Sequence, residues 1–205
     1  MKKRLLVALL VLAMVPAALF AGFFDFGIGA TAQFVPSFNP YETAEFDWAQ
    51  LANIENYGFG ADIRTRIMFA ELDIAGLYSQ ETVDSTTYHG ISGLITGGIS
   101  LDLLGLVRVG LGMGPRVYAL IDDQGNASIY GPNGELTATT DFEDAFMNAP
   151  MTYRATVDLK LGNLMVGVNY TVDSDGFTFA NMDTTKLAPQ FDYGKLGASV
   201  TFILF

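Results

Sequence analysis

The chain contains no cysteine in its 205 residues, and it has a single histidine, His89. Without cysteine, a disulfide, a thiolate metal site and a lipidated N-terminal cysteine are all excluded. Basic residues are also scarce, with 11 Lys and Arg against 22 Asp and Glu, so the formal net charge is −11. Because an acidic surface repels phosphate, this composition argues against nucleic acid as a partner.

Long apolar runs are missing as well, except at the start of the chain. The segment 1–21 has a basic start (Lys2 to Arg4), an apolar run, and Pro16 followed by small residues up to Ala21, which is the pattern of a cleavable secretory signal. A permanent N-terminal anchor is the alternative, but the run is short for a span and Pro16 favours cleavage. We therefore predict a signal peptide at residues 1–21 and one exported domain at residues 22–205.

After residue 21 no apolar run approaches the roughly 20 residues that a membrane-spanning helix needs. Half of the residues are nevertheless hydrophobic, and glycine is abundant. The apolar residues alternate with polar or small ones, as in β-strands, where successive side chains point to opposite faces. Eight segments alternate in this way: residues 26–35, 57–68, 71–80, 89–101, 106–118, 151–161, 164–172 and 194–205.

The faces of these segments separate charge from apolar surface. In the second segment, Phe59, Ala61 and Ile63 share one face, and Asp62 and Arg64 share the other. No segment places an ionised side chain within its apolar stripe. A soluble β-sandwich or lipocalin would hide the apolar face and expose the charged one. Alternation alone leaves both arrangements open, but in a membrane such strands must close into a barrel.

The last segment carries a more specific pattern. It reads polar-x-Gly-x-x-apolar-x-apolar and ends near an aromatic C-terminus, through Lys195, Gly197, Val200, Phe202 and Phe205. In this pattern the chain resembles the bacterial outer-membrane β-barrels, although the pattern ends three residues before Phe205. The resemblance implies an outer-membrane location, contact with outer-membrane lipid and insertion by the barrel-assembly machinery.

The connections between the segments support the same class of protein. Tight links near residues 69–70, 102–105 and 162–163 alternate with longer links at 36–56, 81–88, 119–150 and 173–193. Short periplasmic turns and long outer loops are typical of outer-membrane barrels. The predicted fold is therefore an all-β, eight-stranded antiparallel up-and-down transmembrane β-barrel, similar to the small class that includes OmpW, OmpX and the transmembrane domain of OmpA.

Within the long links we predict a short helix over residues 41–53, a hairpin over 127–136 and a helical turn begun by Thr140 with Glu143. The four long links also carry sixteen of the acidic residues but a single base, Lys186. A soluble, repulsive surface explains this charge, and weak divalent-cation binding by loop carboxylates is the alternative. No link shows the full spacing of a calcium site.

The charged residues on the polar faces are nearly balanced in sign. An eight-stranded barrel has an interior just wide enough for side chains to fill, and buried charges must be paired. We therefore predict a lumen-plugging network of ion pairs and hydrogen bonds. Its candidate members are Asp62, Arg64, Arg66, Glu71, Asp73, Arg108, Arg154, Asp158, Lys160 and Lys195.

The side chains on the polar faces are mostly small toward the predicted outer ends of the strands. This pattern predicts a pocket in the lumen that is open to the outside. Such a pocket would admit a small hydrophobic ligand. Its candidate lining residues are Leu77, Ser92, Gly112, Gly114, Tyr118 and Asn169. The alternative is that loop aromatic side chains fold inward and fill this space, and the candidates for that are Trp48, Phe142, Phe146, Phe177 and Phe179.

Catalytic residues are hard to find in this chain. His89 and Ser92 have opposite parity, so they would point to different faces of one strand and could not form a nucleophilic pair. We therefore expect no enzyme activity, no cofactor and no metal. A barrel that displays acidic loops to an extracellular partner and a narrow channel for small hydrophobic solutes, as in OmpW-like barrels, remain as alternatives, because fold does not fix function.

Overall fold

The computed structural model describes residues 24–43, 46–83, 86–125, 127–130, 136–137 and 142–205. These residues form a sheet of ten strands in which eight strands close into a barrel. The predicted signal peptide, the tip of the predicted hairpin at residues 131–135 and Thr140 lie outside the described residues.

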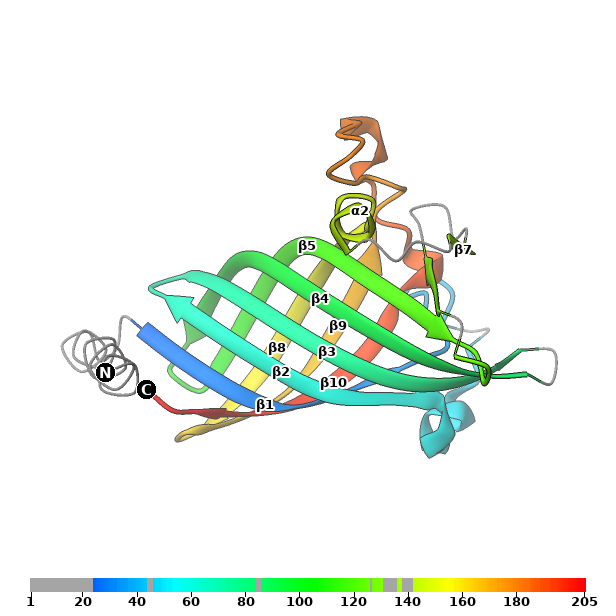
Figure 1. Cartoon of the computed structure of the whole chain (residues 1–205). Coiled ribbons are helices and arrows are strands. Elements are labelled where there is room, and N and C mark those ends of the chain that lie inside the picture. The colour runs from blue at the N-terminus through cyan, green and yellow to red at the C-terminus, as the bar shows by residue number, and fades with distance from the viewer. Residues whose placement is uncertain (1–23, 44–45, 84–85, 126, 131–135, 138–141) are drawn as a thin grey trace, which may run out of the picture.

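The barrel consists of antiparallel neighbours throughout (Figure 1). Around the barrel the order is β4-β3-β2-β1-β10-β9-β8-β5, and the pairing of β4 with β5 closes it. The pairing of β1 with β10 joins the first and last strands, for example at Ala30 opposite Val200. The barrel strands are β1 (Phe24–Phe34), β2 (Tyr57–Ile67), β3 (Ala70–Val83), β4 (Thr86–Leu103), β5 (Val107–Ile121), β8 (Met151–Leu161), β9 (Leu164–Asp173) and β10 (Lys195–Ile203).

Each of the eight predicted segments corresponds to one barrel strand, so the predicted fold class is confirmed. The third and fourth strands are longer than predicted. The link at residues 81–88 was predicted as a loop, but β3 and β4 stay paired up to Val83 opposite Thr86. This link is rich in β-branched residues, which fit the extended backbone of a strand: Thr82, Val83, Thr86 and Thr87.

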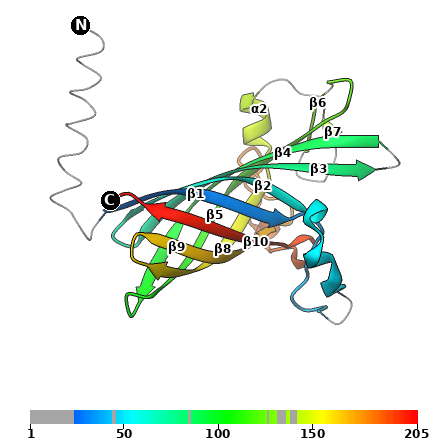
Figure 2. The same ribbon diagram turned by 90° about the horizontal axis from the view of Figure 1, so that it is seen from below.

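The two ends of the barrel differ. The three tight turns lie at the end that also carries the C-terminus, and the long connections lie at the opposite end (Figures 1 and 2). The turn between β8 and β9 consists of Gly162 and Asn163, and Gly162 has a φ of +67°, which glycine adopts without steric cost. The other two turns use Met68 and Leu104 at positive φ.

The long connections contain only short elements. The predicted hairpin is present as β6 (Ala127–Tyr130) and β7 (Leu136–Thr137), and β6 pairs with the outer end of β5. The other elements are α2 (Phe142–Met147) and the 3-10 helices η1 (Trp48–Ala52), η2 (Ile54–Asn56), η3 (Thr184–Leu187) and η4 (Phe191–Tyr193).

The helix predicted over residues 41–53 is wrong, because only its end is helical and only as η1. The side chain of Asp47 accepts a hydrogen bond from the backbone N–H of Ala49, and the side chain of Asn53 accepts one from Glu55. Such local side-chain bonds begin a new short turn each time and compete with one continuous helix.

The apolar stripes face outward and the polar faces line the lumen. No helix among the described residues is long and apolar enough to cross a membrane. The inward face is buried and mostly polar, with Thr31, Asp62, Thr96, Thr152 and Asn169 each less than a tenth exposed. Side chains exposed on the outward face include Ile28, Phe59, Leu72, Ile74, Ile91, Ile95, Ile99, Val109, Leu111, Val157, Leu159, Val166, Val168, Val200 and Phe202.

Candidate functional site

The charged face of β2 organises the lumen. Asp62, Arg64 and Arg66 occupy alternate positions of this strand, so all three point inward. The register with β3 sets Arg64 opposite Asp73 and Arg66 opposite Glu71. Strands β5 and β8 add inward-facing charges from the far side of the barrel.

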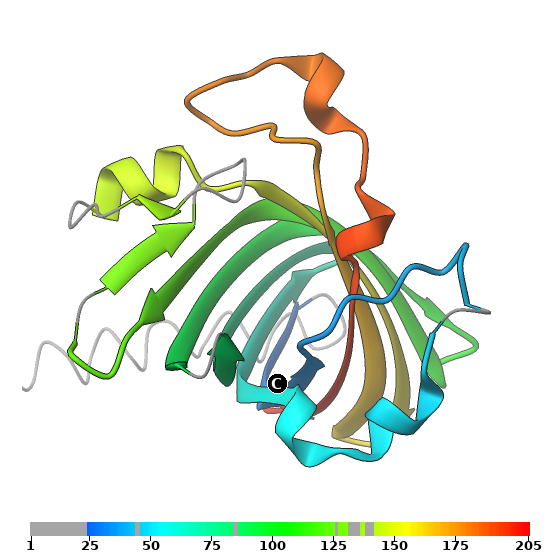
Figure 3. The same cartoon turned by 90° about the vertical axis from the view of Figure 1, so that its right-hand side faces the viewer.

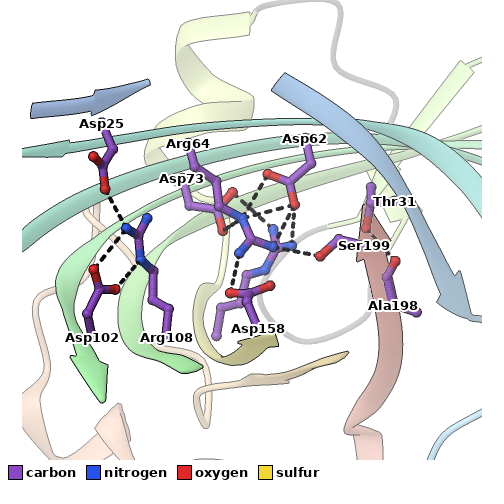
Figure 4. Close-up of polar contacts among 11 residues, drawn as sticks. Asp25, Thr31, Asp62, Arg64, Asp73, Asp102, Arg108, Asp158, Ala198 and Ser199 are labelled. Atoms are coloured by element: carbon purple, nitrogen blue, oxygen red, sulfur yellow. Dashed lines mark hydrogen bonds and ion pairs between the residues drawn. The ribbon is translucent and has the colours of Figure 1, made fainter. Parts of the chain in front are cut away.

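A central cluster forms around Arg64 (Figure 4). Nη1 of Arg64 lies 2.6 Å from Asp158, Nη2 lies 3.0 Å from Asp62, and Nε lies 3.7 Å from Asp73. Arg154 reaches two of the same carboxylates, at 3.0 Å from Asp62 and 3.2 Å from Asp73. These five side chains are at most 5% exposed, so their charges are compensated within the lumen rather than by solvent.

A second group, the turn-side cluster, lies nearer the tight turns and consists of Asp25, Arg66, Asp102, Arg108 and Lys160. Asp102 is bonded to three cations, at 2.8 Å from Arg108, 3.0 Å from Arg66 and 2.7 Å from Lys160. Asp25 lies 2.9 Å from Arg66 and is also bonded to Arg108. The charges come from β1, β2, β4, β5 and β8, so the contacts cross the lumen. Figure 4 shows Arg108 bonded to Asp25 and to Asp102.

Toward the long connections the inward charges are fewer. Arg116 and Asp173 form an ion pair of 2.5 Å, and the hydroxyl of Thr152 donates to the same carboxylate. Lys195 donates to the backbone carbonyl of Val35 at this end.

The structure brings together eight of the ten residues predicted for the lumen network. Glu71 lies beside them but forms no ion pair with any described residue, and Lys195 lies far away at the outer end. Asp25, Asp102, Arg116 and Asp173 were missed. Asp25 and Asp102 continue the alternating inward faces of β1 and β4, so the same alternation would have assigned them to the lumen. The predicted strands ended one residue short of each.

The six residues predicted for the outer pocket are not all neighbours. Leu77, Ser92 and Tyr118 form one row across β3, β4 and β5 on the inward face. Gly114 lies opposite Thr152, whereas Gly112 lies opposite Arg154, at the level of the central cluster, so its assignment to the outer half is wrong. Asn169 lies across the barrel on β9, next to Gly197.

The residues of the predicted targeting pattern lie along β10 and the C-terminus. Lys195, Gly197 and Thr201 have inward parity, and Val200 and Phe202 are exposed on the outward face. The ring of Phe205 lies near the ring of Phe26 on the neighbouring strand β1, with 6.2 Å between the two ring centroids.

One group of loop aromatic side chains lies against the outward face of the barrel. Phe38, Phe46 and Trp48 pack edge to face on one another, and Phe46 covers Phe34, which has the outward parity of β1. The hydroxyl of Tyr170, outward-facing on β9, donates to the carbonyl of Phe38. Phe146 stacks on Phe179. The connections surround the rim when the barrel is viewed along its axis (Figure 3). The side chain of Phe142, another candidate for filling the lumen, is not among those that the structure describes.

The two residues considered for catalysis point to different environments. Nδ1 of His89 lies 2.7 Å from the hydroxyl of Tyr78 on the neighbouring strand. Ser92 is buried on the lumen face. Among the described residues no group of three or more His, Cys, Asp or Glu side chains could hold a metal ion.

Comparison with known proteins adds little to this geometry. No family model matches the chain, and no curated protein matches it. Among solved structures, the crystal structure of Neisserial surface protein A (NspA) is similar over 89% of this chain and 97% of that chain, at 15% sequence identity and with a TM-score of 0.47. A likeness at this level says nothing about function.

Proposed function

We propose that this protein is an integral outer-membrane β-barrel whose lumen is closed to solutes in its periplasmic half and whose function lies at its outer surface. The observation that carries the proposal is the pair of charge clusters, in which ten side chains from six strands bond to one another across the lumen. Water and ions would have to break several buried ion pairs to pass, and each such break costs several kcal/mol.

The membrane location rests on the outward face. Large apolar side chains are exposed on the wall all around the barrel, and an exposed apolar surface of this extent is not stable in water. Alternation of apolar-out and polar-in with closed backbone pairing is the arrangement that lipid requires. The C-terminal pattern of β10 and the predicted signal peptide at residues 1–21 support export and insertion by the barrel-assembly machinery.

The acidic connections support a role in display to an extracellular partner. Four acidic residues lie on connections at the end opposite the tight turns: Asp47, Asp175, Asp183 and Asp192. Hydrogen bonds from the hydroxyl and the backbone N–H of Thr185 lower the pKa of Asp183, so this loop carboxylate stays ionised near neutral pH. A partner would be cationic, because like charges across an interface repel.

A solute-uptake assay tests the closed lumen. The refolded full chain would be reconstituted into liposomes, and swelling would be followed in solutions of small sugars and amino acids. We expect swelling no faster than in protein-free liposomes. Rapid swelling would instead support a narrow channel and would remove the proposal.

A second candidate function is the binding of a small apolar molecule in the outer half of the lumen. Leu77, Ser92 and Tyr118 lie side by side there, on the side of the charge clusters that faces the long connections. We expect a small apolar fluorophore to bind the wild-type protein and to bind at least ten times more weakly to Leu77→Asp. Leu104→Asp, in an exposed turn at the other end, is the matched control. Equal binding by both variants would rule this function out.

A further inference from the structure

Among the described residues, Glu71 is a carboxylate near the two clusters that their ion pairs leave out. The clusters contain five acidic and five basic side chains, so they are balanced without it. Arg66, its neighbour across the ladder, is bonded to Asp25 and Asp102. Glu71 is only 9% exposed, and its Oε2 makes no hydrogen bond to any described residue. A buried carboxylate oxygen in this position needs a donor.

Glu71 lines a small cavity. Its volume is about 10 Å³, which is close to the smallest space that holds one water molecule. The cavity extends from β3 to β8 across the wall formed by β4 and β5. The residues that line it are Glu71, Asp73, Thr96, Gly98, Gly110, Leu111, Gly112, Arg154 and Thr156.

Three of the lining residues have a polar atom without a hydrogen-bond partner among the described residues: Oε2 of Glu71, Nε of Arg154 and Oγ1 of Thr156. Arg154 is 3% exposed and Thr156 is 3% exposed, so bulk solvent does not reach either side chain. The terminal nitrogens of Arg154 are already bonded to Asp62 and Asp73, so its Nε–H is the donor that is left over.

These three atoms match the hydrogen bonds of a single water molecule. Water accepts one bond from the Nε–H of Arg154 and donates one each to Oε2 of Glu71 and Oγ1 of Thr156. A cation would lie against the Arg154 guanidinium, and an anion would lie against Glu71 and Asp73. We therefore propose that this cavity is the binding site of one structural water molecule, which links Glu71 to Arg154 and through it to the central cluster. The water would bind whether or not the barrel conducts solutes.

The sign of a stability change tests the site. In Thr156→Val the side chain keeps its shape but loses its hydroxyl. If water bridges the site, the variant loses a hydrogen bond and the urea midpoint of the refolded barrel falls. If no water binds, the substitution removes an unsatisfied buried group, which is neutral or stabilising, and the midpoint stays or rises.

Thr201→Val is the matched control. Oγ1 of Thr201 is also buried on the inward face without a partner among the described residues, but Thr201 does not line this cavity. We expect its midpoint to stay or rise while that of Thr156→Val falls. Equal shifts in the two variants would overturn the proposal.

A crystal structure of the wild-type protein at high resolution provides the second measurement and does not depend on any variant folding. We expect one solvent peak within hydrogen-bond distance of Oε2 of Glu71, Nε of Arg154 and Oγ1 of Thr156. A direct Glu71–Arg154 contact would overturn the proposal, and so would an anomalous signal at this position after rubidium replaces sodium, because the occupant would then be a cation.

Discussion

Arg64 holds the lumen together because it contacts three carboxylates from three strands. Asp62, Asp73 and Asp158 lie within 3.7 Å of its guanidinium, and its Nη2 also donates to the hydroxyl of Ser199 at 2.8 Å. A buried ion pair contributes little net stability compared with an apolar replacement of the whole group, but removal of one partner leaves an uncompensated charge. The cluster is therefore sensitive to single substitutions.

Arg64→Met tests this sensitivity. The substitution keeps an unbranched side chain but leaves Asp62 and Asp73 with Arg154 alone and removes the ion pair of Asp158. We therefore expect the free energy of unfolding to fall by about 3–5 kcal/mol. Urea unfolding of the refolded barrel, followed by tryptophan fluorescence, measures the change. Lys186→Met, on an exposed loop, is the control and should change stability by less than about 0.5 kcal/mol. A loss for Arg64→Met as small as the control's would contradict the assigned contacts.

Sequence parity was sufficient to assign most inward charges, because alternation is strict within a strand. It could not show that Asp102 is shared by Arg66, Arg108 and Lys160, since those contacts depend on the register between strands and on side-chain reach across the lumen. The sequence also could not show that Glu71 is left out of the ion pairs, because its ladder neighbour Arg66 bonds to Asp25 and Asp102 instead.

At the scale of the strand, the side chains on the outward face determine whether a strand can lie in contact with lipid. Val168 is in the middle of β9 and is 60% exposed on that face, between Val166 and Tyr170. In lipid this position contacts hydrocarbon, whereas a turn residue such as Leu104, which is 97% exposed, lies at the edge of the barrel. Both positions are exposed, but they differ in depth along the barrel axis.

Val168→Arg should therefore destabilise the barrel in lipid by about 2–4 kcal/mol, while Leu104→Arg should cost only about 0–1 kcal/mol. The measurement is reversible unfolding of each variant in phospholipid vesicles. If Val168→Arg were as stable as Leu104→Arg, the outward face of β9 would not be in contact with hydrocarbon.

Connecting elements were harder to predict than strands. The β3–β4 link extends as paired strands because its β-branched residues favour extended backbone, and the predicted helix over residues 41–53 is replaced by two short turns capped by Asp47 and Asn53. The loop cluster of Phe38, Phe46 and Trp48 packs on the outer wall instead of entering the lumen. Its position depends on a contact with Tyr170, which lies far away in sequence.

At the scale of the whole molecule, the two ends of the barrel give it a direction. Three tight turns lie at one end and the long connections lie at the other (Figure 1). The alternation of link lengths predicted this asymmetry from the sequence, because hairpin turns need few residues and exposed loops tolerate many.

Single-cysteine variants test this direction, and the absence of native cysteine makes the labelling specific. We expect a membrane-impermeant maleimide to label Met182→Cys, in the exposed connection between β9 and β10, on intact cells. Leu104→Cys, in a tight turn, should be labelled only after the outer membrane is permeabilised. The reverse pattern would mean that the long connections face the periplasm.

The closed lumen is tested most directly by single-channel recording on the refolded full chain in a planar lipid bilayer. The two charge clusters predict that insertions give no current steps above the baseline, while a known porin in the same bilayer conducts. Regular ion-conducting steps in most insertions would contradict the account, because ions would then pass a lumen whose buried charges are bonded to one another.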